Sequence, residues 1–206
     1  MSKNERTTLP KGPAGQKRND KQRRKPDRRI RRTRSQLGNA LIELIQDKPI
    51  DEVTVKEVLD RASVGRSTFY LHYRDKDDLF LCQMEDGLEM WSTVLSKKQE
   101  KSRRVVPVEE FFAHAASARK FYRALVDSGR IQAFFDLAQG YFARGIARRL
   151  REIGPATLVP CELEARSQGL AGNLLSLLKW WLDRDAKEPP KAMDDLFHRM
   201  VWDGLQ

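Results

Sequence analysis

The stretch from Val53 to Lys76 has the pattern of two short helices joined by a tight turn. Thr54 is a typical helix N-cap, and Glu57, three residues later, completes a capping box. The apolar residues that follow have the spacing of one helix face: Val55, Val58, Leu59 and Ala62. We expect Gly65 to provide the bend after this helix, because glycine adopts turn conformations at low cost.

The second helix of this pair is predicted to run from Arg66 to about Tyr73. Phe69 and Tyr73 lie four residues apart and are expected to face inward. The outer face then carries Arg66, Ser67, Tyr70 and Arg74, with Thr68 and His72 at its flanks. A face of hydrogen-bond donors and aromatic rings suits a helix that enters the DNA major groove. The alternative is an ordinary helical hairpin whose polar faces contact only solvent.

The run from Ala62 to Leu79 resembles the DNA-binding domain of the TetR family of bacterial one-component transcription regulators. It has the turn, a Thr-Phe-Tyr core, a His-aromatic pair, and a Lys with acidic residues opening the next helix. The resemblance is strong over about residues 30–80 and extends further only as helical pattern. It implies an all-α fold: an N-terminal three-helix helix-turn-helix domain followed by a C-terminal helical bundle, with about nine helices in total.

Positive charge is concentrated at the N-terminal end of the chain, which has 206 residues and a net charge of +10. Residues 1–34 contain 14 Lys or Arg and 3 acidic residues, so the remainder is nearly neutral. Residues 1–29 lack apolar periodicity, and we expect a disordered basic arm that binds DNA phosphates. The alternative is a solvated tail that only aids solubility.

The expected organisation is a helix-turn-helix domain over residues 30–76 and an effector-binding and dimerisation domain over residues 77–206. The first domain begins with a helix over about residues 30–46. The second is predicted to hold helices over about 75–96, from Pro107, over 121–126, 131–153 and 161–183, and from Pro190.

The candidate DNA-binding residues are Arg32, Thr54, Lys56, Arg66, Ser67, Thr68, Tyr70, His72, Tyr73 and Lys76. Arg66 is the best candidate for a base contact, because a guanidinium binds guanine through two hydrogen bonds. Ser67, Thr68 and Tyr70 are candidates for bases, thymine methyls or phosphates, while Thr54 and Lys56 are assigned to one DNA backbone. The resemblance implies phosphate contacts for His72, Tyr73 and Lys76.

The resemblance also implies a ligand pocket among the helices of the C-terminal domain. The candidate walls are Trp91, Phe112, His114, Tyr122, Phe135, Tyr141 and Phe142. Such walls suit a small, mostly apolar effector. The alternative for each residue is an ordinary place in the core, where aromatic residues at helical spacing usually lie.

The segment from Gly169 to Leu182 is apolar on nearly every side, so it must be covered on every side. We expect that its leucines and Trp181 cannot all face one monomer core. The candidate homodimer interface is Leu174, Leu175, Leu178, Trp181, Leu182, Phe197, Met200 and Val201. The alternative is that these residues only close the core of the monomer.

The sequence contains no pattern that indicates catalysis. His72, His114 and His198 fall in separate predicted helices, and no metal-binding or nucleophile motif is present. We expect no catalytic residues, no metal, no cofactor, no membrane span and a cytoplasmic, nucleoid-associated bacterial protein. The expected function is a repressor released from a double-stranded DNA operator by a small effector. The alternatives are control by a protein partner, a regulator without an effector, or an activator; a membrane-surface or RNA-binding module is a more distant one.

Overall fold

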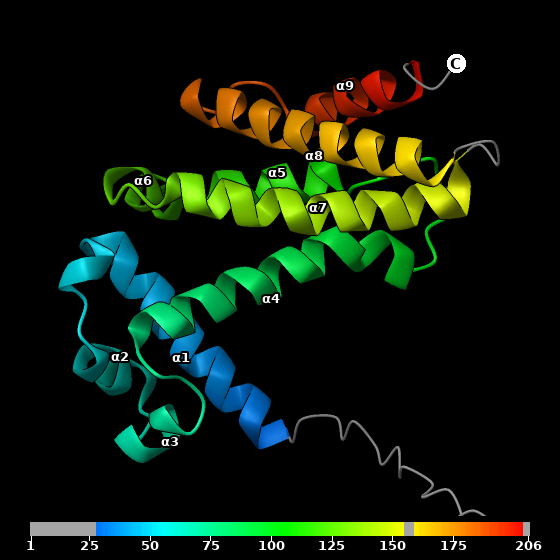
Figure 1. Ribbon diagram of the computed structural model, residues 1–206. Coiled ribbons are helices and arrows are strands. Elements are labelled where there is room, and N and C mark those ends of the chain that lie inside the picture. The colour runs from blue at the N-terminus through cyan, green and yellow to red at the C-terminus, as the bar shows by residue number, and fades with distance from the viewer. Residues whose placement is uncertain (1–27, 155–158, 204–206) are drawn as a thin grey trace, which may run out of the picture.

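The computed structural model describes residues 28–154 and 159–203, and every regular element within these ranges is helical (Figure 1). The elements are α1 (Arg28–Asp47), η1 (Ile50–Glu52), α2 (Val55–Ala62), α3 (Arg66–Tyr70), α4 (Lys76–Lys97), α5 (Val108–Ser117), α6 (Arg119–Asp127), α7 (Ile131–Ile153), α8 (Pro160–Asp183) and α9 (Pro190–Asp203). The predicted all-α fold is confirmed. In the described ranges, no helix has the length and apolar character needed to cross a lipid bilayer.

The predicted basic arm lies outside the described residues except for Arg28 and Arg29, which form the first turn of α1. These two arginines are therefore helical, which corrects the expected helix start near Ile30. The predicted boundary between residues 76 and 77 falls within the first turn of α4, which begins at Lys76. The division into two domains at that point stays a prediction.

The capping box that starts α2 is present as predicted. The Thr54 hydroxyl accepts a hydrogen bond from the Glu57 amide, and the Glu57 carboxylate accepts one from the Thr54 amide. The bend after α2 differs from the prediction, because Ser63 adopts the left-handed conformation with φ of 53°. Gly65 is extended instead and serves as the N-cap residue of α3.

The predicted third helix is shorter than expected, because α3 ends at Tyr70. The chain still continues in turns, with the Tyr73 amide donating a 2.9 Å hydrogen bond to the Phe69 carbonyl. Phe69 and Tyr73 are both buried, which confirms that they face inward. Tertiary packing of these two rings therefore holds a helix that is too short to be stable alone.

Two clusters of buried side chains organise the molecule. One surrounds the helix-turn-helix and includes Leu37, Leu41 and Phe69. Leu125 of α6 also belongs to this cluster, and Phe134 of α7 packs against it. The C-terminal bundle therefore contributes side chains to the core of the helix-turn-helix, next to α1 (Figure 1).

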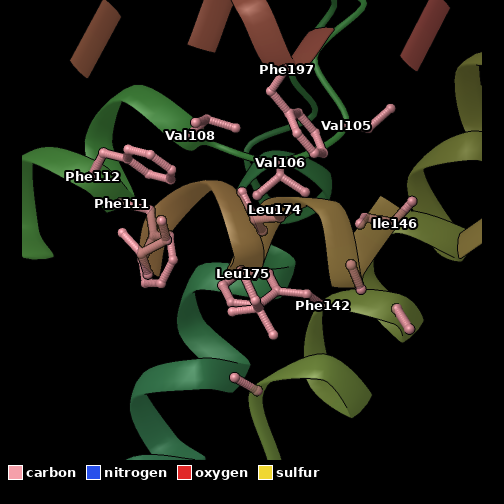
Figure 2. Close-up of a cluster of buried hydrophobic side chains, with 14 of the residues drawn as sticks. Val105, Val106, Val108, Phe111, Phe112, Phe142, Ile146, Leu174, Leu175 and Phe197 are labelled. Atoms are coloured by element: carbon pink, nitrogen blue, oxygen red, sulfur yellow. The ribbon is translucent and has the colours of Figure 1, made fainter. Parts of the chain in front are cut away.

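The second cluster fills the bundle of α5, α7, α8 and α9, and its centre is shown in Figure 2. Leu174, Leu175 and Phe197 are among its buried members. Seven of the eight predicted dimer residues are buried inside a single chain: Leu174, Leu175, Leu178, Trp181, Leu182, Phe197 and Val201. The expectation that one monomer core cannot hold these side chains of α8 is wrong, because α5, α7 and α9 surround the helix on several sides.

Candidate nucleic-acid interface and cavity

The exposed surface of α3 is built from Arg66, Ser67 and Tyr70. The Tyr70 ring packs edge-on against Phe69, with centroids 5.2 Å apart, and keeps 49% of its surface exposed. The guanidinium carbon of Arg66 lies 5.8 Å from the centroid of the Tyr70 ring. The buried Phe69 thus fixes an aromatic ring beside an exposed guanidinium, a pair of groups suited to base edges and phosphates.

Other predicted DNA-binding residues also have accessible side chains. Thr54 and Lys56 at the start of α2 are exposed, and Arg32 is exposed in the first turns of α1. Thr68 and His72 are half-buried. Eight of the ten predicted DNA-binding residues therefore keep accessible side chains that are consistent with their predicted roles. Their contacts with DNA stay predictions.

The side chains of Tyr73 and Lys76 are engaged within the protein. Tyr73 is buried, and its hydroxyl oxygen accepts a 3.1 Å hydrogen bond from Arg34 Nε. Burial raises the pKa of Tyr73. Lys76 Nζ donates hydrogen bonds to the carbonyl oxygens of Ile50, Asp51 and Val53 at 2.7, 2.9 and 2.8 Å. An ammonium has three N–H donors, so the predicted phosphate contacts of these two side chains are corrected to structural roles.

The bundle contains a cavity of about 130 Å³ among α4, α5, α6, α7 and α8. Four of the predicted wall residues line it: Trp91, His114, Tyr122 and Phe135. The other three predictions are wrong. Phe112 and Phe142 are fully buried in the bundle core, and the Tyr141 ring packs against the guanidinium of Arg144 at 4.5 Å.

The cavity walls are almost entirely apolar and carry no Asp, Glu, Lys or Arg side chain. The hydroxyl of Tyr122 donates a 3.1 Å hydrogen bond to Asp183. Burial and this carboxylate raise the pKa of Tyr122 to about 12, so the phenol stays neutral at pH 7. A space of this kind favours an uncharged, apolar guest, and a cavity of about 150 Å³ holds a molecule of benzene size.

Several wall residues were not predicted from the sequence. Gln83, Met84, Phe121, Leu125 and Phe134 line the cavity, and they carry no motif that separates a wall from a core. Leu125 also belongs to the core of the helix-turn-helix, and Phe134 packs against that core. For the four apolar residues of this set, the only sequence signal is helical spacing, which is common to every buried residue; the polar Gln83 has no such signal.

A three-helix unit that exposes Arg66, Ser67 and Tyr70 on its short third helix defines a helix-turn-helix DNA-binding protein. Residues 39–81 match the sequence profile of bacterial regulatory proteins of the tetR family. The helix-turn-helix of this chain therefore belongs to the tetR family of bacterial regulatory domains, which is a family of transcription regulators.

Three known proteins are similar to the chain over most of its length. The uncharacterized HTH-type transcriptional regulator YxbF of Bacillus subtilis (strain 168) is 25% identical over 177 residues. The match spans 82% of this chain but only 43% of that relative. A TetR transcriptional regulator from Streptococcus agalactiae 2603V is 26% identical, with a TM-score of 0.52 over 85% of this chain and 96% of that one. The dihydroxyacetone kinase operon activator DhaS shares the fold, with a TM-score of 0.64 at 12% identity over 84% of this chain and 96% of that one.

Proposed function

We propose that this chain is a sequence-specific transcriptional repressor that binds a double-stranded DNA operator and is released by a small, mostly apolar effector. The exposed face of α3 carries this proposal, because Arg66, Ser67 and Tyr70 are free to reach base edges in a major groove. Residues 30–76 would bind DNA, and residues 77–206 would bind the effector and a second copy of the chain.

A partly exposed, mostly apolar strip on α8 and α9 supports dimerisation through these helices. Leu170, Asn173, Leu177 and Trp180 follow one another at helical spacing on α8, and Trp180 is 44% exposed. Met200 of α9, which is 39% exposed, lies next to Asn173. These residues replace the buried ones in our proposed interface. A twofold mate on this face would hold two copies of α3 at the spacing of about 34–36 Å that successive major grooves require.

The shared wall between the cavity and the helix-turn-helix core supports control by a small ligand. Leu125 lines the cavity and is also buried among the residues around α1. A guest that needs a wider cavity would displace this wall, and it would shift the position of the helix-turn-helix by its difference in affinity for the two states. The aromatic cavity favours this mechanism over control by a protein partner.

Selection of DNA fragments from a random library by the purified chain tests the DNA-binding role. We expect Arg66→Ala to cost about 1–3 kcal/mol on the selected fragment and little on a scrambled one. Arg123→Ala, which removes an exposed arginine from α6, is the matched control and should leave both affinities nearly unchanged. Equal losses on both DNAs for Arg66→Ala would refute the base contact.

A panel of small compounds tests the effector. Uncharged aromatic and aliphatic compounds should release the selected fragment, whereas charged analogues of the same size should not. Ala115 lies in the cavity wall, so Ala115→Phe should fill the space and prevent release while DNA binding persists. Release by the same compounds from Ala115→Phe would show that they act elsewhere.

A further inference from the structure

The turn between α6 and α7 ties the cavity wall to a single arginine. Gly129 has a φ of +69° and its amide donates to the Val126 carbonyl. The Arg130 amide donates a 3.0 Å hydrogen bond to the Leu125 carbonyl, and the Arg130 carbonyl accepts a 3.1 Å bond from the Phe134 amide. Leu125 and Phe134 both line the cavity, so the backbone position of Arg130 follows the position of this wall.

The guanidinium of Arg130 reaches the DNA-binding part of the chain at two points. One nitrogen lies 2.8 Å from Asp51 Oδ1, in η1 just before α2. Another nitrogen lies 3.1 Å from Asp77 Oδ1, in the first turn of α4. The carbonyl of Asp51 also accepts a hydrogen bond from Lys76, so this arginine joins the network that fixes η1 to the start of α4.

No other ion pair found among residues 28–154 and 159–203 connects a residue after 100 with a residue before 80. The remaining contact between α6 and the helix-turn-helix includes the apolar packing around Leu125. Apolar contact is non-directional, whereas an arginine that binds two carboxylates restricts orientation as well as distance. Arg130 is therefore placed to set the angle at which α2 and α3 stand relative to the bundle.

We propose that Arg130 is a positioning residue for operator binding: its pairs with Asp51 and Asp77 hold the helix-turn-helix in the orientation that lets both recognition helices of a dimer reach DNA. The inference rests on the proposed function as an operator-binding dimer. Loss of the pairs leaves the fold and the face of α3 intact, but the distance between the two recognition helices of the dimer then varies over a wider range. Operator affinity then falls, while affinity for random DNA hardly changes.

The expected effect is moderate, because the two carboxylates are exposed. The side chains of Asp51 and Asp77 are 72% and 52% exposed. Exposed pairs contribute little each, so we expect Arg130→Gln to weaken operator binding by about 3- to 30-fold. Arg119→Gln is the matched control: Arg119 has the same exposure of 32% and pairs with Asp185, away from η1 and α4. It should change operator affinity less than about twofold.

Variants of Asp51 and Asp77 distinguish a positioning role of Arg130 from a general effect of its charge on DNA affinity. Removing a negative charge from a DNA-binding protein should tighten binding to any DNA by electrostatics alone. Positioning predicts the opposite for the full-length Asp51→Asn and Asp77→Asn variants, whose operator binding should weaken. In the variant that carries both changes, Arg130→Gln should add nothing, because the three residues act as one unit. Urea unfolding of each variant checks that the fold is retained.

The results that would overturn the proposal are specific. Equal effects of Arg130→Gln and Arg119→Gln on operator affinity would do so, and so would tighter binding by the aspartate variants. If the wild-type chain selects no DNA at all, the proposed function fails instead. In that case, amide hydrogen exchange tests whether Arg130 holds the helix-turn-helix in place. Amides of residues 50–62 should exchange faster in Arg130→Gln than in Arg119→Gln, and equal rates would reject the positioning role of Arg130.

Discussion

Lys76 Nζ donates a 2.7 Å hydrogen bond to the carbonyl oxygen of Ile50, which lies 26 residues earlier in the chain. The same ammonium also holds the carbonyls of Asp51 and Val53. A single side chain at the start of α4 thus holds the backbone of η1, which leads into α2, in place. The lysine that suggested a DNA phosphate contact is a part of the scaffold.

Replacing Lys76 should therefore lower stability. Lys76→Met keeps the apolar stem but leaves three carbonyl groups without this donor, and we expect a loss of roughly 1–3 kcal/mol in the free energy of unfolding. Urea unfolding followed by circular dichroism measures it. Lys56→Met is the control, since Lys56 is exposed on α2. An unchanged unfolding midpoint for Lys76→Met, together with weaker binding to all DNA, would restore the phosphate assignment.

The capping box of α2 should weaken in acid. Hydrogen bonds from Lys48 first, and then from Thr54, lower the pKa of Glu57 from its usual 4.5 to about 2. Since the folded-state pKa is depressed, the stabilisation is complete above about pH 5 and is lost as the pH falls towards 2. The difference in unfolding midpoint between wild type and Glu57→Gln should narrow over this interval. A difference that stays constant from pH 7 to pH 3 would contradict this linkage.

The crossing of α4 and α7 depends on a missing side chain. A Cβ atom at Gly145 would lie 2.2 Å from the backbone oxygen of Ser92, so Gly145→Ala must force the helices apart. We expect it to destabilise the fold by about 1–3 kcal/mol. Gly140 lies in the same helix with only a flexible Arg144 side chain nearby, and Gly140→Ala should stabilise by up to ~1 kcal/mol. Chemical unfolding of both variants tests the contrast, and equal effects would contradict it.

A glutamate introduced on the proposed dimer face should have a different effect from a glutamate introduced in the bundle core. Trp180→Glu combined with Met200→Glu changes two exposed side chains, so the chain should stay folded while the dimer dissociates at least about tenfold more readily. Leu174 is fully buried, and Leu174→Glu should unfold the chain. Analytical ultracentrifugation and circular dichroism separate the two outcomes. A double variant that remains as dimeric as wild type would remove α8 and α9 from the interface.

Local sequence signals were sufficient for most helices. Residues 131–153 were expected to form one helix, and α7 has the same bounds. Asp75 caps α4 as expected, because its side chain accepts the Asp78 amide. Caps, glycines, prolines and apolar spacing act within a few residues, so a single sequence contains the information. The same signals placed Arg66 and Ser67 on an exposed helix and Phe69 in the core.

Helix ends near Ser63 and Tyr70 were less well predicted. Ser63 takes the left-handed bend although Gly65 lies two residues later, and α3 stops at Tyr70 although the apolar spacing continues to Tyr73. The rings of Phe69 and Tyr73 are both buried, with centroids 5.7 Å apart, and pack beside the end of α3. Packing overrides intrinsic propensity where a short helix is held mainly by its neighbours.

The amino-acid sequence by itself determined the helical class, the caps, the basic N-terminal end and the exposed polar face of α3. Only the tertiary structure decided that Leu174 and Trp181 lie inside one chain, that Phe112 is core while Phe135 lines a cavity, and that Lys76 binds backbone carbonyls. Periodicity shows that a side chain is apolar and on which side of its own helix it lies. The neighbour that covers that side comes from segments far apart in the chain, and their arrangement is fixed only when all the helices pack together.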